Sequence, residues 1–358
     1  MNPSSQPLVS VLTPVYNGEE YLAECIESIL AQTYQNWDCT IVNNRSTDRT
    51  EEIARRYAAG DSRIRMRSNR DFLPPVTSHN TALRQLSPNA KYCKLLFADD
   101  FLFPECLEKM VTLMEMHPSV GIVSSYGLQG KEVKWTGLPY PSTVVRGREV
   151  CRRRLLNGPY VFGTGTTHMI RADLVRSRDP FYNESNLHCD SEVCFQILET
   201  CDFGFIHQIL SYTREYGSES VTTSASRLHT LEAATLYEML TYGRTFLSAE
   251  EYPSALEAKL DDYYVHLAHS VLEGKESWDF HTKKMAELGL PLDRRRLAKA
   301  VLVKAARALW VHPKRTVERL LTGKSVVSGR LGSIGQKNSA RRKQTSASQG
   351  ASSEPHRP

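Results

Sequence analysis

Long hydrophobic runs are absent from the 358-residue sequence. No stretch of about 18 or more uncharged apolar residues occurs, so we expect no segment that spans a membrane as a helix. Residues 1–8 also lack a basic stretch that leads into an apolar one, so a secretory signal is not expected. Together these two absences predict a protein that acts in the cytoplasm.

Motifs for several common functions are absent as well. The eight cysteines lie in apolar contexts without a Cys-x-x-Cys pair, which excludes the usual zinc sites and a dense disulfide framework. Residues 163–165 (Gly-Thr-Gly) lack the third glycine of a dinucleotide-binding turn and the lysine of a phosphate loop, which argues against a dehydrogenase or an ATPase. A net charge of +5, from 45 basic and 40 acidic residues, gives no sign of a nucleic-acid partner.

The composition that remains is typical of a globular protein. Hydrophobic residues make up 41% of the chain and charged residues 24%, and the length suggests about two domains. Short β-branched runs at 8–12, 37–42, 64–66 and 92–97 alternate with segments of helical apolar periodicity. This alternation predicts an α/β fold with a mostly parallel central sheet flanked by helices.

The pattern changes along the chain and predicts a domain plan. We expect an α/β domain over 1–226, a helical C-terminal region over 227–324, and a disordered basic tail over 325–358. Within the helical region, 294–308 forms an amphipathic helix with a basic face. Such a helix either lies on an anionic membrane surface or packs its apolar face on the α/β domain.

Polar groups follow three of the expected strands, where parallel sheets bind their ligands. They are at 14–17, 43–48 and 99–100. The adjacent carboxylates Asp99 and Asp100 repel each other unless a cation or hydrogen bonds compensate, which makes them candidates for a hard-metal site that could clamp a diphosphate. The alternative is that one aspartate caps the next helix and the other is solvated.

These motifs resemble those of inverting family 2 glycosyltransferases, which have the GT-A fold. The resemblance rests on VSVLTPVYN (9–17), SILAQTY (28–34), IVNNRSTD (41–48) and KLLFADD (94–100), in family order and spacing. It extends through an acidic segment at 181–198 and a strand at 202–214. It thus covers about 7–222, with a nucleotide-sugar-binding half at about 8–125 and an acceptor-side half at 126–226.

The resemblance implies a role for each matching residue. The donor-binding residues would be Pro14, Tyr16, Asn44 and Asp99, the metal ligand Asp100, and the general base Asp190. Tyr16 would pack on the nucleobase beside Pro14, and Asn44 would hydrogen-bond the base edge. Glu192 competes with Asp190 for the role of base, and Asp190 could instead cap the helix that begins there.

The implied function is transfer of a sugar from a nucleotide-diphosphate sugar, most simply a UDP-sugar, with Mg²⁺ or Mn²⁺. The acceptor would be a hydroxyl of a glycan, polysaccharide or glycolipid, including a lipid-linked acceptor, reached in the cytoplasm or at the inner face of the cell membrane. Two departures from the family pattern stand out, because Asn43-Asn44 replaces two aspartates and Phe97 replaces an acidic residue. The alternative function is a catalytically silent module that binds a sugar nucleotide or a glycan on the same fold.

Overall fold

The computed structural model describes residues 6–214, 225 and 227–311. The expected disordered tail at 325–358 and the end of the family resemblance near residue 222 lie outside the described residues. The chain divides into two compact units, 1–260 and 261–358. The helix at 230–246, which the sequence analysis assigns to the C-terminal region, is therefore part of the first unit.

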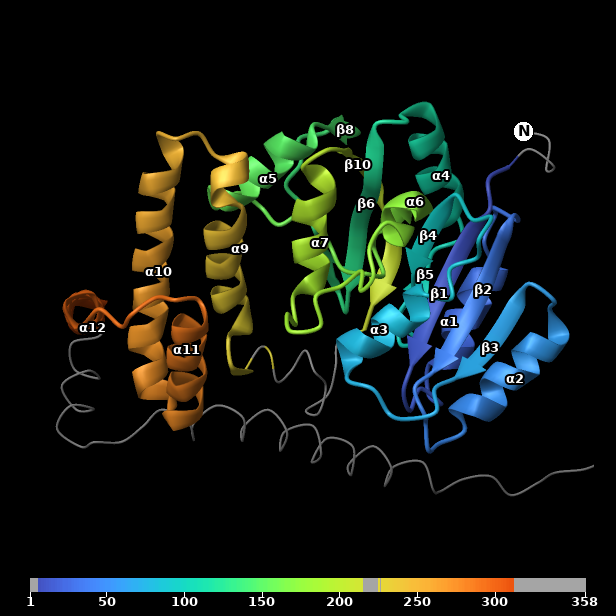
Figure 1. Cartoon of the computed structure of the whole chain (residues 1–358), viewed down its shortest axis with the longest axis horizontal. Helices are drawn as coiled ribbons and strands as arrows, with labels where there is room; N and C mark the ends of the chain where they lie inside the picture. Colours follow the sequence, from blue (N-terminus) through green and yellow to red (C-terminus); the bar gives the residue numbers. More distant parts are fainter. Residues whose placement is uncertain (1–5, 215–224, 226, 312–358) are drawn as a thin grey trace, which may run out of the picture. The chain divides into compact units, whose positions relative to one another are not determined.

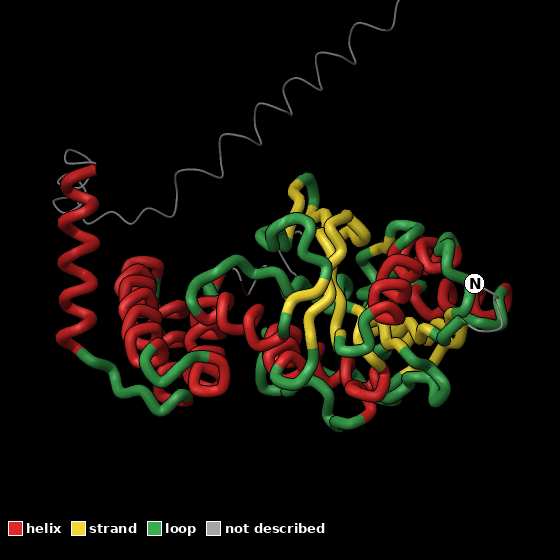
Figure 2. The backbone as a smooth tube through the Cα atoms, turned by 90° about the horizontal axis from the view of Figure 1, so that it is seen from above, coloured by secondary structure: helices red, strands yellow, loops and turns green. Residues whose placement is uncertain are grey.

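A mixed β-sheet forms the centre of the first unit (Figures 1 and 2). Its strands are β1 (Val9–Val15), β2 (Trp37–Asn43), β3 (Ile64–Ser68), β4 (Tyr92–Leu95), β5 (Phe101–Leu102), β6 (Val120–Gln129), β7 (Glu132–Lys134), β8 (Val144–Val145), β9 (Met169–Arg171) and β10 (Asp202–Thr213). The order across the sheet is β3-β2-β1-β4-β9-β6-β10-β5, with β7 on β6 and β8 on β10. The predicted α/β fold is confirmed.

Parallel pairing is confined to two parts of the sheet. Strands β3, β2, β1 and β4 are mutually parallel, and β6 is parallel to β10. Between these parts lies β9, which is antiparallel to both β4 and β6. The first part lies within the predicted nucleotide-sugar-binding half. Because its strands are parallel, their carboxyl ends share one edge of the sheet.

Helices cover both faces of this sheet. Both faces need this cover because successive side chains of a buried strand point to opposite faces of the sheet. Val9, Val11 and Val15 of β1 belong to one core, with α1 (Leu22–Leu30), α2 (Thr50–Gly60) and α4 (Cys106–Met116). Leu12 belongs to the other, with α3 (Pro75–Leu83), α5 (Gly147–Leu155), α6 (Ala172–Arg176), α7 (Cys189–Leu198) and α9 (Thr230–Phe246). Strands β1, β2 and β4 are therefore packed on both faces, whereas β3 contributes to the first core alone.

Lys94 of β4 is fully buried and joins this strand to the segment just before β9. Its ammonium donates to the carbonyl oxygens of Thr166 (2.5 Å) and His168 (3.0 Å), just before β9. Burial lowers the pKa of this amine, but the two carbonyls supply the bonds that a buried ammonium needs. Thr166 in turn donates from its hydroxyl to Asp100.

The remaining helices are α10 (Glu251–Glu273), α11 (Lys275–Glu287) and α12 (Arg294–Val311). Helix α12 begins at the residue where the sequence predicts the basic helix and extends three residues beyond its expected end at residue 308. Leu302 is 69% exposed, and Val301 and Val303 are also exposed. Among the described residues, no helix combines the length and the apolar character needed to cross a membrane.

Candidate active site

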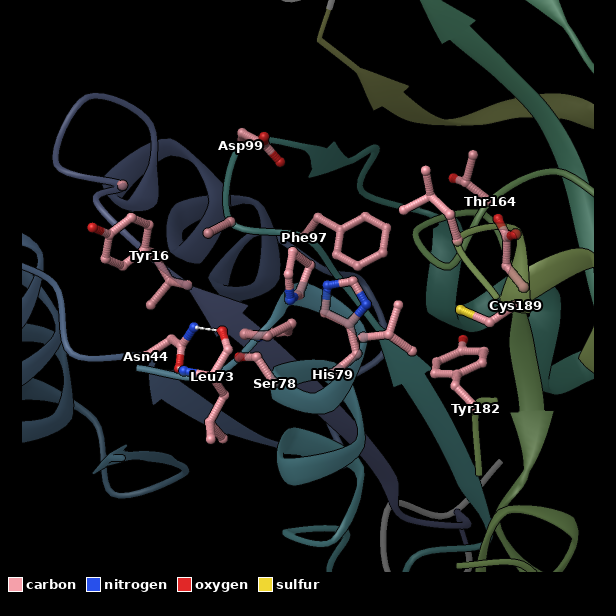
Figure 3. A pocket seen from close by; sticks show the side chains of 18 of the residues that line it. Tyr16, Asn44, Leu73, Ser78, His79, Phe97, Asp99, Thr164, Tyr182 and Cys189 are labelled. Atoms are coloured by element: carbon pink, nitrogen blue, oxygen red, sulfur yellow. Dashed lines mark hydrogen bonds between the residues drawn. The ribbon is translucent and has the colours of Figure 1, made fainter. Parts of the chain in front are cut away.

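A pocket of about 620 Å³ opens at the carboxyl ends of β1, β2 and β4, toward α3 and the start of α7 (Figure 3). Of the residues singled out from the sequence, the pocket is lined by Pro14, Tyr16, Asn44, Asp99 and Asp190. Asp100 is not among the lining residues. The structure thus brings side chains separated by 176 positions, from Pro14 to Asp190, to one cavity.

Tyr16 presents an aromatic surface at one end of the pocket. The residue is 49% exposed, and its ring meets Phe72 edge to face, with the ring centroids 4.8 Å apart. The next residue, Asn17, adopts a left-handed backbone (φ 48°) and accepts a hydrogen bond from the Thr47 N–H (2.8 Å). The loops after β1 and β2 are therefore joined, which fixes the position of Tyr16 for stacking against a planar ligand.

Asn44 holds the loop that carries Phe72. Its amide oxygen accepts from the Leu73 N–H (3.0 Å) and from Asn69 (2.9 Å), and its amide nitrogen donates to the Leu73 carbonyl (2.8 Å; dashed in Figure 3). These bonds use both acceptor positions of the oxygen and one N–H donor. The second N–H is the group that Asn44 can offer to a ligand. An aspartate could not donate to the Leu73 carbonyl, so the departure from the family pattern has a structural role.

The two adjacent aspartates have different environments. Asp99 is half-buried and lines the pocket (Figure 3). Asp100 is 2% exposed, and its carboxylate accepts hydrogen bonds from the Thr166 hydroxyl (2.6 Å) and the Arg214 N–H (3.2 Å). Burial, and then the charge of Asp99, raise the pKa of Asp100. This geometry makes Asp100 a fixed support of the loop and leaves the pocket-facing position to Asp99.

A divalent metal bound with a diphosphate fits this arrangement. Within the part of the chain that the structure describes, no cluster of three or more histidine, cysteine or acidic residues could hold a metal by itself. Magnesium-type sites at phosphates need only one or two carboxylates, because phosphate and water oxygens complete the shell. Asp99 supplies one such carboxylate at the pocket wall. That Asp100 is the metal ligand remains a prediction from the sequence, and the two hydrogen bonds of Asp100 favour Asp99 for this role.

Asp190 and Glu192 also separate clearly. Asp190 lies in the first turn of α7 and lines the pocket. Burial is the main cause that raises its pKa to about 6, and the charge of Glu238 adds to it. Glu192 is 4% exposed and accepts from Asn183, Asn186 and Tyr237, so its carboxylate is committed to the interior. Asp190 is therefore the acid that a ligand can reach.

Three further residues of the pocket were assigned no role from the sequence. His79 of α3 packs against Phe97, with ring centroids 4.9 Å apart, and burial lowers its pKa to about 4. Its imidazole is therefore neutral at pH 7. Tyr182 and His188 line the side near Asp190, and the His188 ring bonds to Thr230 of α9 (2.9 Å). A sequence does not show the hydrogen-bond partner of a histidine, so the placement of the His188 ring against Thr230 could not be predicted from it.

The matching family model is described as glycosyl transferase family 2 and covers residues 10–178. A Bacillus subtilis protein named as a glycosyltransferase, EpsE, is 34% identical over 161 residues, which cover 43% of this chain and 57% of that protein. An uncharacterized glycosyltransferase of Haemophilus influenzae is 31% identical over 50% of this chain and 56% of its own length. The chain thus spans little more than half the length of these relatives.

Solved structures extend the likeness in fold beyond the family match. S. aureus TarS in complex with UDP-GlcNAc superimposes with a TM-score of 0.60 at 16% identity, over 87% of this chain and 88% of that one. The mannosyltransferase PcManGT of Pyrobaculum calidifontis, in complex with GDP-Man and Mn²⁺, gives 0.51 at 17% identity, over 90% and 89%. At these identities the match concerns the fold. Residues 10–178 thus match glycosyl transferase family 2, in a chain whose fold is the GT-A fold of these solved structures.

Proposed function

We propose that the domain is an inverting glycosyltransferase that moves a sugar from a nucleotide-diphosphate sugar, UDP-linked, to a hydroxyl of a glycan, polysaccharide or glycolipid. The observation that carries the proposal is the position of Tyr16 and Asp99 at one pocket with Asp190. A nucleobase stacks on Tyr16, the diphosphate lies toward Asp99, and the acceptor hydroxyl meets Asp190. The structural neighbours in complex with UDP-GlcNAc and GDP-Man support a nucleotide sugar as the donor.

Asp190 acts as the general base in this proposal. Inversion requires one in-line displacement, so the chain needs a group that accepts the proton of the attacking hydroxyl and no nucleophile of its own. A carboxyl with a pKa of about 6 is ionised at pH 7 and is a stronger base than an ordinary aspartate. His79 is neutral in the same pocket and can bond to sugar or phosphate oxygens without adding charge.

Asp99 would hold Mg²⁺ or Mn²⁺ together with the diphosphate. When bound, the metal would neutralise charge that develops on the leaving nucleotide. The Mn²⁺ present with PcManGT supports the choice of a divalent ion. Asp100 supports the position of Asp99 through Thr166 and Arg214.

A polysaccharide or lipid-linked acceptor agrees with a further relative. A Bacillus subtilis protein named for teichuronic acid biosynthesis, TuaG, is 30% identical over 36% of this chain and 50% of its own length. Helix α12 combines the exposed Val301, Leu302 and Val303 with the exposed cations Arg294 and Arg295. We propose that it contacts the anionic inner face of the membrane, where each well-placed cation contributes about 1 kcal/mol. Flotation with anionic and with neutral vesicles tests this contact.

A panel of donors tests the proposed reaction. UDP-, GDP-, dTDP- and CMP-sugars are offered with Mn²⁺ or with EDTA, and binding and hydrolysis are measured for the parent, Asp99→Asn and Asp190→Asn. We expect one donor to bind and hydrolyse in a metal-dependent way, with binding weakened in Asp99→Asn and hydrolysis reduced in Asp190→Asn. Binding of a donor without any turnover by the folded parent, with acceptors also supplied, would favour the silent binding module instead.

A further inference from the structure

A buried ion pair lies behind the first turn of α7. Glu238 of α9 is 3% exposed, and one of its carboxylate oxygens lies 3.3 Å from the guanidinium of Arg154 of α5. The other oxygen accepts a hydrogen bond from the Ser191 hydroxyl at 2.6 Å. None of these three residues lines the pocket. Three helices therefore meet at one buried carboxylate that a ligand in the pocket does not touch.

This carboxylate is coupled to Asp190 by the chain itself. Ser191 follows Asp190 directly, and the Ser191 N–H donates to the Asp190 carboxylate (2.9 Å). The bond from the Ser191 hydroxyl to Glu238 thus fixes the residue whose backbone orients Asp190. Removal of a buried carboxylate from such a pair has large effects, because its partners are left without a bond. The Glu238 charge also adds to burial in raising the pKa of Asp190.

We propose that Glu238 is a positioning residue for Asp190: it anchors the first turn of α7 through Ser191 and places a fixed negative charge behind the carboxylate. This inference rests on the proposed role of Asp190 as the general base. A negative charge at this place favours the protonated form of Asp190 and so makes Asp190 a better proton acceptor. Burial raises the pKa of Glu238, and the charge of Arg154 acts against this and favours the ionised carboxylate.

Other ionisable groups lie around the carboxylates of Asp190 and Glu238. Those that act on Asp190 or Glu238 electrostatically are Tyr160, Tyr182, Cys151, Cys189, Cys194 and Lys259. Burial raises the pKa of every tyrosine and cysteine in this set, so they are neutral near pH 6. Glu238 is thus the acidic side chain whose removal should alter the titration of Asp190.

The test follows the titration of Asp190 itself. The full chain is labelled with carboxyl-¹³C aspartate, the Asp190 signal is identified by its loss in Asp190→Asn, and its midpoint is measured by NMR in the parent and in Glu238→Gln. We expect the midpoint to move to lower pH by about half a pH unit or more in Glu238→Gln. Glu232→Gln, which removes a charge from the exposed side of the same helix, should leave the midpoint unchanged.

Further variants keep the test decisive. If Glu238→Gln does not fold, Arg154→Met/Glu238→Gln removes both charges together and should shift the midpoint in the same direction by a smaller amount, because loss of the Arg154 cation acts in the opposite sense. Ser191→Ala loses the anchor and keeps the charge, so it should lower the rate of donor hydrolysis with a smaller change of midpoint. An unchanged midpoint in the folded Glu238 variants overturns the inference. Because the titration needs no donor, this result is distinct from a failure of the proposed sugar transfer, which the donor panel decides.

Discussion

Asparagine in place of Asp99 and, separately, of Asp100 should give opposite results. Asp99→Asn removes a charge from the pocket wall without disturbing the interior, so we expect metal-dependent binding of the nucleotide to weaken by about tenfold or more. The free energy of unfolding should change by no more than about 0.5 kcal/mol, as for other substitutions outside the core. Asp100→Asn should leave nucleotide binding nearly unchanged, because that side chain faces away from the ligand.

The magnitude for position 100 follows from its two hydrogen bonds. In Asp100→Ala the Thr166 hydroxyl and the Arg214 N–H both lose their acceptor, and each unsatisfied buried donor costs about 1–3 kcal/mol. The loss is therefore about 2–6 kcal/mol, less the relief of repulsion with Asp99. In Asp100→Asn the amide oxygen still accepts from Arg214, and the amide N–H can donate to the Thr166 oxygen. The cost should then be smaller than in Asp100→Ala, because only the Thr166 hydroxyl loses its acceptor.

The two measurements are urea unfolding and calorimetric titration of UDP in the presence of Mn²⁺. Each kcal/mol lost should also lower the melting temperature by about 2–4 °C for a unit of this size. Glu108→Gln, which alters an exposed acid on α4, serves as a control for loss of one negative charge. The reasoning is refuted if Asp100→Asn abolishes the metal-dependent binding while Asp99→Asn leaves it intact, since Asp100 would then be the ligand of the metal.

Three more perturbations test the site. In a pH-rate profile of the parent, the rate of sugar transfer should fall below pH 6 with a midpoint near the pKa of Asp190, about 6, because the base must be ionised. A midpoint near the pKa of an ordinary aspartate, about 4, would exclude Asp190 as the general base. Lys94→Met should lower the free energy of unfolding by about 2 kcal/mol or more, because the Thr166 and His168 carbonyls lose their donor. An unchanged midpoint of urea unfolding would contradict this. Asn44→Asp should lower the free energy of unfolding by about 1–3 kcal/mol and weaken nucleotide binding, because a carboxylate would face the Leu73 carbonyl. An affinity for the nucleotide equal to that of the parent would show that the loop with Phe72 and Leu73 does not depend on this bond.

The sequence was sufficient to predict which strand ends meet at the pocket. Parallel strands place their carboxyl ends at one edge, so Tyr16, Asn44 and Asp99 could be assigned to one site before any coordinates. It was not sufficient to choose between neighbours. Consecutive residues at a strand end or on a helix point in different directions, and only the packing of 164–168 and of α9 shows that Asp100 and Glu192 face inward.

His79 marks a second limit of the sequence. It lies on a short helix whose apolar residues have little periodicity, so no pattern shows which side faces the pocket. The role of Asn44 in holding Leu73 was also beyond prediction, because it depends on a loop distant from it in the chain. Such contacts are set by tertiary structure, and local sequence carries no signal for them.

The buried ammonium of Lys94 has a consequence for how the domain can be divided. The residues that donate and accept at this joint lie far apart in the chain, with the carbonyls at 166 and 168 more than seventy positions after the lysine. A fragment that ended near residue 125 would contain the amine without its acceptors and would have to hydrate or deprotonate it. The first half should therefore not be an autonomous folding unit, and during synthesis it reaches its final packing only after the strand at 169–171 has joined it.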